Sequence, residues 1–177
     1  MDKKFASLPI FQIPAVALVD SKGWRLNIDG LVENPLKLSR RDITKLPSIT
    51  VYDDFTCLEG WTVKGITWKG VRVSELLMLA SIKSTAKCVI FSSGDYAQGL
   101  SIQRCMQPTT ILAYELNEAP LTPEHGAPLR LISRRQECFE SVKWMNSIHL
   151  TDEQIQGSAR QIALGRLAQY QRDRPKV

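Results

Sequence analysis

The chain has 177 residues, of which 44% are hydrophobic and 23% are charged, and this composition is typical of a soluble globular protein. We expect one domain over residues 1–177 with its own core, and no stretch approaches the roughly 20 apolar residues of a membrane span. The net charge of +5 favours an anionic partner. Because the charges are scattered and no nucleic-acid module is evident, a DNA- or RNA-binding domain is the weaker alternative.

Prolines at positions 9 and 14 interrupt the apolar residues near the N-terminus, so no secretory signal is predicted. No Cys-x-x-Cys pair occurs, and the chain has only two histidines, so a structural zinc site is not expected. A domain of this size needs no disulfide. We therefore expect a cytoplasmic location with reduced thiols at Cys57, Cys88, Cys105 and Cys138.

The first elements follow from alternation of apolar and polar residues and from one capping pattern. Strands are predicted over 24–32 and 36–38. Ser39, with Asp42 three residues later, is typical of a helix N-terminus, and the short helix that it predicts ends before Pro47.

The next strand, 49–55, is expected to deliver Cys57 at its end. Ser74 is predicted to cap a second short helix over 75–80, and residues 117–120 are typical of a turn. Further strands are predicted over 87–91, 100–102, 110–116, 129–132 and 142–150. Many short strands with small helices between them predict an α+β fold, a β-rich domain with a mixed sheet.

The C-terminal tail, 152–177, is predicted to be helical. Thr151 to Gln154 resembles a capping box, and the apolar residues that follow fall roughly on one helical face. We expect this basic helix to pack on its own domain, whose core spans about 24–151. Binding of a partner protein is the alternative.

Cys57 lies among aromatic residues in the sequence, close to Phe55, Trp61 and Trp68. These rings would shield its thiol from water, which leaves two interpretations. The thiol is either an inert core residue, as buried cysteines often are, or a thiolate held by something positive, since thiolate is a soft metal ligand.

Two later segments contain residue types suited to binding a phosphorylated ligand. In 125–131, Gly126 permits close approach of the backbone, and Arg130 can form two parallel hydrogen bonds to phosphate oxygens. In 141–144, Lys143 supplies a point charge. Taken singly, each residue is more often a turn, a core residue or part of a solvated face, so the segments argue for a site only together.

Together with Cys57 and the Trp68-Lys69-Gly70-Val71 stretch, these segments resemble the molybdopterin-binding domain of the sulfite oxidase family. That family includes sulfite oxidases, plant-type nitrate reductases and bacterial methionine sulfoxide reductases of this fold. The resemblance extends from about Trp24 to about Thr151. It implies an oxidoreductase whose cofactor carries the redox chemistry.

The resemblance implies that Cys57 binds molybdenum directly, with one metal per chain and one pterin dithiolene as its other sulfur ligand. It implies no haem or flavin. The expected cofactor contacts are Ser93, His125, Arg130, Ser141, Val142 and Lys143.

The sequence also departs from the family pattern. Sulfite oxidases carry basic residues after the metal-binding cysteine, whereas Glu59 and Trp61 follow it here, and Glu140 stands where a basic residue is common. We therefore expect oxo transfer with a neutral S- or N-oxide as the small-molecule substrate, in preference to sulfite. No second redox centre is encoded, so a separate electron-transfer partner is expected. A non-catalytic cofactor-binding or interaction module is the alternative function.

Overall fold

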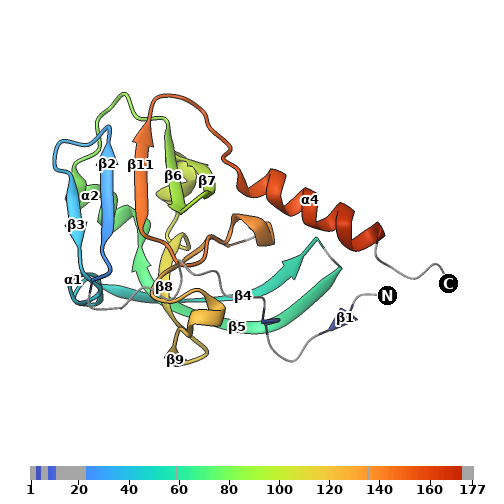
Figure 1. Cartoon of the computed structure of the whole chain (residues 1–177). Helices are drawn as coiled ribbons and strands as arrows, with labels where there is room; N and C mark the ends of the chain where they lie inside the picture. Colours follow the sequence, from blue (N-terminus) through green and yellow to red (C-terminus); the bar gives the residue numbers. More distant parts are fainter. Residues whose placement is uncertain (1–2, 5–7, 11–22, 59, 135, 173–177) are drawn as a thin grey trace.

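The computed structural model describes residues 3–4, 8–10, 23–58, 60–134 and 136–172, and only the backbone of residues 3, 4, 170 and 171. Two sheets and a few short helices make up this part of the chain (Figure 1). The first sheet contains β1 (Lys3–Lys4), β4 (Ser48–Cys57), β5 (Trp61–Arg72), β8 (Ile111–Leu116), β9 (Ala119–Pro120) and β10 (Arg130–Ile132). The second contains β2 (Leu26–Gly30), β3 (Leu36–Leu38), β6 (Cys88–Ser93), β7 (Tyr96–Ser101) and β11 (Ser147–Thr151).

Strand order confirms the mixed, β-rich α+β fold. The first sheet runs β1-β5-β8-β10, with β4 beside β5 and β9 beside β8, and the second runs β3-β2-β11-β6-β7. Most neighbours are antiparallel, whereas β11 is parallel to β2 and β1 is parallel to β5. The helices are α1 (Arg40–Thr44), α2 (Val73–Ala80), α3 (Ile102–Cys105) and α4 (Ala159–Arg172), with the 3-10 turns η2 (Pro123–His125) and η3 (Cys138–Glu140). No helix in the described part of the chain is long and apolar enough to cross a membrane.

Two clusters of buried side chains form the core. The larger one joins the two sheets, with Leu112 from the first facing Phe91 and Ile148 from the second. The smaller one lies on the β4–β5 side and includes Phe55 and Trp68. Because β4 and β5 continue beyond β8, their hairpin extends outward from the body of the molecule, and α4 lies above it in Figure 1.

Two predictions that depend only on neighbouring residues are confirmed. Ser39 caps α1 through a complete capping box, in which its hydroxyl accepts from the Asp42 N–H and the Asp42 carboxylate accepts from the Ser39 N–H. Asn117 and Glu118 both have positive φ, as a tight hairpin turn requires, and they connect β8 to β9.

Two predicted helix starts are wrong. Helix α2 begins at Val73 after Arg72, without a side-chain cap, and Ser74 is buried inside it. The capping box at Thr151 is not formed, because Thr151 ends β11 and pairs with Cys88 of β6. Its hydroxyl accepts from the N–H of Glu153, two residues on, and α4 starts only at Ala159.

The strand predictions need three corrections. Strand β5, the longest in the described chain, was not predicted. The strand expected over 142–150 is confined to Ser147–Thr151, since the preceding residues belong to the site. The strand expected over 100–102 is the end of β7, and Ile102 begins α3 after the N-cap Ser101.

Candidate active site

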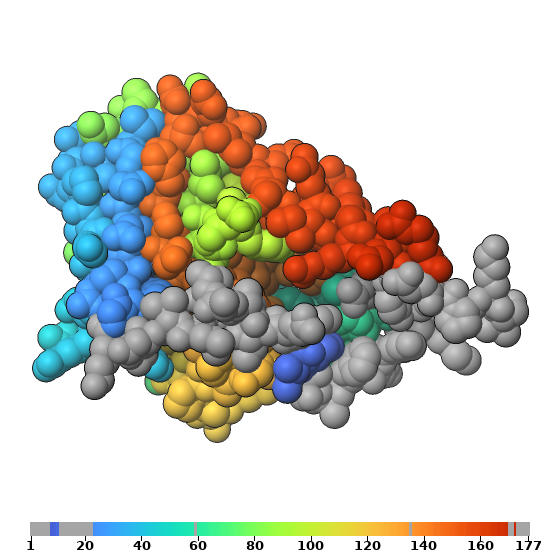
Figure 2. Space-filling view, viewed as in Figure 1, coloured from blue at the N-terminus to red at the C-terminus, as the bar shows by residue number. Residues whose placement is uncertain are grey.

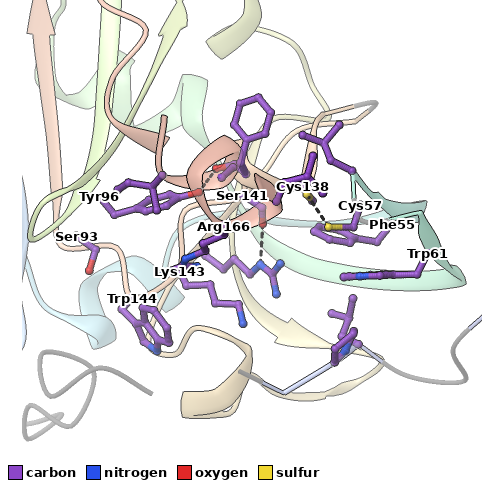
Figure 3. Close-up of a pocket in the computed structure, with 18 of the residues that line it drawn as sticks. Phe55, Cys57, Trp61, Ser93, Tyr96, Cys138, Ser141, Lys143, Trp144 and Arg166 are labelled. Carbon is purple, nitrogen blue, oxygen red and sulfur yellow. Dashed lines mark hydrogen bonds between the residues drawn. The ribbon is translucent and has the colours of Figure 1, made fainter. Parts of the chain in front are cut away.

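A cavity of about 950 Å³ opens between the tip of the β4–β5 hairpin, the β6–β7 turn, η3 and α4. In Figure 3, Ser93, Tyr96 and Trp144 lie on one side and Cys57, Phe55 and Trp61 on the opposite side, with Lys143 and Ser141 between them. Five of the predicted site residues line this cavity: Cys57, Ser93, Arg130, Ser141 and Lys143. The sequence positions of these residues span almost half of the chain, and the fold brings them to one space.

Cys57 lies at the end of β4, where the hairpin turns. It pairs with Trp61 across the hairpin, and its carbonyl accepts from the N–H of Gly60, whose φ of 82° suits the turn. The rings of Phe55 and Trp61 stack with their centroids 6.0 Å apart beside it. Two of the three aromatic residues expected around this thiol therefore flank it, and the thiol, which is half-buried, lines the cavity.

Arg130 is the buried cation of the site. It is 3% exposed, and its guanidinium lies 5.0 Å from the Phe55 ring centroid and 4.9 Å from that of Trp68. Its Nε donates to Ser141 Oγ at 2.7 Å, and one terminal nitrogen donates to the His125 carbonyl at 3.2 Å. Burial lowers the pKa of Arg130 to about 9. No carboxylate of the described residues forms an ion pair with it.

A second cation, Lys143, lies against the loop that carries His125. Its Nζ donates to the Glu124 carbonyl at 2.8 Å. Burial, with the charges of Arg130 and Arg166, lowers the pKa of Lys143 to about 7. Gly126, with a φ of 106°, packs so closely that an added Cβ would lie 2.8 Å from the Lys143 Cβ. The glycine thus allows the loop and the lysine to approach each other, whereas the close approach of this loop to a ligand stays a prediction.

Two polar atoms at the site are buried without partners among the described residues. Ser93, 6% exposed, lines the cavity with its hydroxyl unsatisfied, and His125 Nδ1 is likewise unsatisfied. Buried polar groups in folded proteins are nearly always hydrogen-bonded. Desolvation by burial, and then the charges of Lys143 and Arg130, lower the pKa of His125. The unsatisfied Ser93 hydroxyl points to a polar ligand in the cavity.

The structure does not bring every predicted contact to the cavity. His125 does not line the cavity. Its carbonyl accepts a hydrogen bond from Arg130, which does. Val142 is buried in the larger core, with its N–H donated to Glu140 and its carbonyl accepting from Leu131. The roles expected for these two residues stay predictions.

Sequence reasoning missed several residues of the cavity wall, and two of them carry reactive or charged groups. Cys138, on η3, lies with its Sγ 2.9 Å from the Sγ of Cys57 (Figure 3). Arg166 comes from α4, in the tail that was expected only to pack on the domain. Ile162, Ala163 and Leu167 of the same helix also line the cavity. Nothing local in the sequence signals such long-range contacts. The one available signal was the position of Cys138, three residues before the Ser141–Trp144 motif.

Glu140 does not place its charge in the cavity. Both of its oxygens accept from Arg104 at 2.7 Å. This bidentate ion pair neutralises the negative charge that distinguishes the chain from the family pattern here. Glu59, the other acidic departure from the family pattern, lies outside the described residues. Asp95 and Tyr96 both line the cavity, and burial raises the pKa of Tyr96 to about 12, so its hydroxyl stays protonated.

Figure 2 shows α4, in orange to red, lying beside the green β6–β7 hairpin on the same face of the molecule. The helix therefore closes the side of the cavity opposite the β4–β5 hairpin, which Figure 1 shows running below it. The cavity has a soft thiol and aromatic rings at one end and buried cations with an unsatisfied hydroxyl further in. These features define a class of protein: a domain whose cavity is suited to an anionic, phosphate-bearing cofactor and is lined by a cysteine.

Comparison with known proteins specifies that class. The family model described as "Oxidoreductase molybdopterin binding domain" matches residues 11–159. The uncharacterised oxidoreductase YuiH of Bacillus subtilis is 34% identical over 139 residues, covering 78% of this chain and 70% of YuiH. The catalytic subunit of the protein-methionine-sulfoxide reductase MsrP of Campylobacter jejuni is 29% identical, covering 89% of this chain and 59% of that protein.

Comparison with a solved structure supports the same family. The crystal structure of the sulfane dehydrogenase SoxCD from Paracoccus pantotrophus matches with a TM-score of 0.72 and 25% identity, over 79% of this chain and 41% of that chain. The chain belongs to the molybdopterin-binding oxidoreductase domain family, of the sulfite oxidase type, and the members of this family are enzymes. It spans 70% of YuiH but a smaller share of the other relatives described here.

Proposed function

We propose that this chain is a molybdenum-cofactor-dependent oxidoreductase in which the Cys57 thiolate binds the metal, one metal per chain. The observation that carries the proposal is that one cavity holds a shielded thiol and a buried guanidinium without a carboxylate partner among the described residues. Thiolate is a ligand for soft metal centres, and an unneutralised buried cation suits a phosphate.

The residues present fit the cofactor. Arg130 and Lys143 would bind its phosphate and pterin oxygens, and the unsatisfied Ser93 hydroxyl would complete a hydrogen bond to it. Ser141 would hold the Arg130 guanidinium in position through its hydroxyl. When bound, the cofactor supplies a metal centre that exchanges an oxo group and two electrons with substrate. Phe55 and Trp61 would exclude water from the Cys57 sulfur.

The walls near Cys57 favour a neutral oxide as substrate. Leu58 and Trp61, which neighbour Cys57 at the tip of the hairpin, give this end of the cavity an apolar lining. Arg130 and Lys143 lie further in, where they would serve the cofactor. The relative MsrP is named for methionine sulfoxide, a neutral S-oxide, which supports the same substrate class.

Electrons would be exchanged with a separate partner protein, since the cavity residues offer no second redox centre. A cytoplasmic location, expected from the sequence, stays a prediction. The alternative function, a cofactor-binding or interaction module without catalysis, shares the cavity and would differ in turnover alone.

Metal analysis tests the proposed function. Protein purified from a host that makes the cofactor is expected to carry about one molybdenum and one pterin per chain, with Cys57→Ser reducing the metal content because the soft ligand is lost. Elemental analysis and a pterin assay give both numbers, and circular dichroism checks that the variant folds. Wild-type protein that repeatedly lacks metal and pterin would show the proposal to be wrong.

Substrate assays test the neutral-oxide preference. Loaded protein is expected to reduce a neutral S- or N-oxide with an artificial electron donor, and to turn over sulfite poorly, because the apolar walls near Cys57 offer a dianion no compensation for desolvation. Steady-state rates with both substrates decide between them. Fast sulfite turnover by wild type would contradict the preference. If that turnover were lost in Arg166→Ala, α4 would be identified as the source of the cation that binds sulfite.

A further inference from the structure

Two cysteines far apart in the sequence meet in the cavity. Cys57 at the end of β4 and Cys138 on η3 are 81 residues apart, and their sulfur atoms lie 2.9 Å from each other (Figure 3). We propose that Cys57 and Cys138 form a reversible disulfide in the cofactor-free protein, so that cofactor uptake requires a reducing environment. The consequence for uptake rests on the proposed function, in which Cys57 binds the metal.

The backbones that carry both thiols are held in place. Cys57 is part of the β4–β5 ladder, opposite Trp61. Cys138 opens η3, whose end is fixed by the two hydrogen bonds between Arg104 and Glu140, and the Tyr96 hydroxyl donates to the carbonyl of Phe139. The sulfurs are already in contact, so bond formation needs a shift of less than about 1 Å. Side-chain adjustment can supply this without moving either element.

The pair is also accessible, because both cysteines line the cavity. A small oxidant can therefore reach them from solvent. The other two cysteines differ in this respect. Cys88 and Cys105 are buried in the core and do not line the cavity, and burial raises the pKa of Cys105 to about 12, which keeps it as the unreactive thiol.

The reaction is thiol–disulfide exchange with a low-molecular-weight disulfide, R–S–S–R. One protein sulfur attacks the small disulfide, forms a mixed disulfide and releases one R–SH. The second protein sulfur then attacks the mixed disulfide, which forms the Cys57–Cys138 bond and releases a second R–SH. Two electrons and two protons pass from the protein to the oxidant. The sulfur that would bind the metal is then no longer a thiolate.

Peptide mapping tests the bond itself. Full-length protein from a host that cannot make the cofactor is treated with oxidised glutathione, alkylated and digested with trypsin without reduction. We expect a linked pair of peptides, 46–64 and 136–143, lighter by two hydrogen atoms than their sum and separated by dithiothreitol. Cys57→Ser and Cys138→Ser should each abolish the pair, whereas the control Cys88→Ser should retain it. Absence of the pair from oxidised wild type, or linkage through Cys88 or Cys105 in its place, would overturn the proposal.

A second measurement separates this inference from the proposed function. Reduced and oxidised wild-type protein are offered the released cofactor, and bound molybdenum is measured. We expect the reduced form to load, the oxidised form to lose loading, and dithiothreitol to restore it. Equal loading of the linked and reduced forms would overturn the gating of uptake. Failure of reduced wild type to load would contradict the proposed function, whereas the peptide map would still decide whether the bond forms.

Discussion

Replacing Arg130 with alanine is expected to abolish most cofactor loading while the cofactor-free chain still folds. A hydrogen bond to a charged group is worth roughly 1.5–3 kcal/mol, so loss of the guanidinium should weaken cofactor binding by about ten- to a hundredfold. Lys143→Ala should act in the same direction, because Lys143 packs against the same loop, next to Gly126. Molybdenum and pterin per chain, measured on protein from a host that makes the cofactor, give the result.

Folding should suffer less because burial of the Arg130 charge already carries a cost. Its pKa is lowered to about 9 by desolvation, and no carboxylate of the described chain offsets that penalty. Alanine removes the penalty together with the hydrogen bonds to Ser141 and His125. Thermal unfolding of the cofactor-free variant should therefore stay close to that of wild type, although two acceptors lose their donor.

Two controls sharpen the Arg130 experiment. Arg130→Lys keeps a charge but loses the planar fork, so it should load between wild type and alanine. Arg40→Ala removes an exposed arginine from α1, away from the cavity, and should load like wild type. Wild-type occupancy in both Arg130→Ala and Lys143→Ala would show that these residues do not bind the cofactor.

The features that the sequence predicted best are those set by neighbouring residues. The capping box of Ser39 and the turn at Asn117 need only a few adjacent groups, so tertiary packing had little to change. The Thr151 box failed for the opposite reason. Thr151 lies opposite Cys88 at the end of β11, its carbonyl accepts from the N–H of Lys87, and this strand pairing outweighs one side-chain cap.

Strand β5 was not predicted because its buried residues switch from odd to even positions part-way along the strand. Trp61 and Val63 are buried at odd positions, whereas Ile66 and Trp68 are buried at even ones. The change coincides with a shift in the β4–β5 register. Between the pairs Asp53–Ile66 and Phe55–Val63, β5 has one residue more than β4. A bulge of this kind breaks the alternation on which strand prediction depends, although the residues on both sides of it are good strand formers.

The residues of the candidate site fall into the same two groups, those that short motifs indicate and those that only tertiary packing brings to the cavity. The resemblance indicated Arg130, Ser141 and Lys143 because they sit in short motifs, and the structure places them in one cavity with Cys57. Cys138 and Arg166 come to that cavity only through the packing of η3 and α4. No periodicity or motif encodes those contacts, so only a folded structure could reveal them.

Replacing Gly70 with alanine is expected to destabilise the fold by about 3 kcal/mol or more and to reduce cofactor loading as well. A Cβ at this position would lie 2.1 Å from the Leu112 carbonyl oxygen and 2.7 Å from the Ala113 Cα. Both are backbone atoms of β8, which cannot rotate away as a side chain can, so β5 and β8 must separate. Overpacking of a core usually costs about 1–3 kcal/mol, and backbone contacts this short belong at or above the upper end.

The loading defect follows from sheet register. Gly70 is opposite Ala113 in β8, and Ala113 is opposite Arg130 in β10, so a displacement of β8 moves the residue expected to bind the cofactor. Urea unfolding gives the change in free energy, and metal content gives the loading. Gly165→Ala is the matched control, because this helical glycine has no atom within 4 Å of its added Cβ and should become more stable by about 0.5–1 kcal/mol. If Gly70→Ala unfolds within about 0.5 kcal/mol of wild type, the range of an ordinary surface substitution, the close β5–β8 approach does not explain why glycine occupies this position.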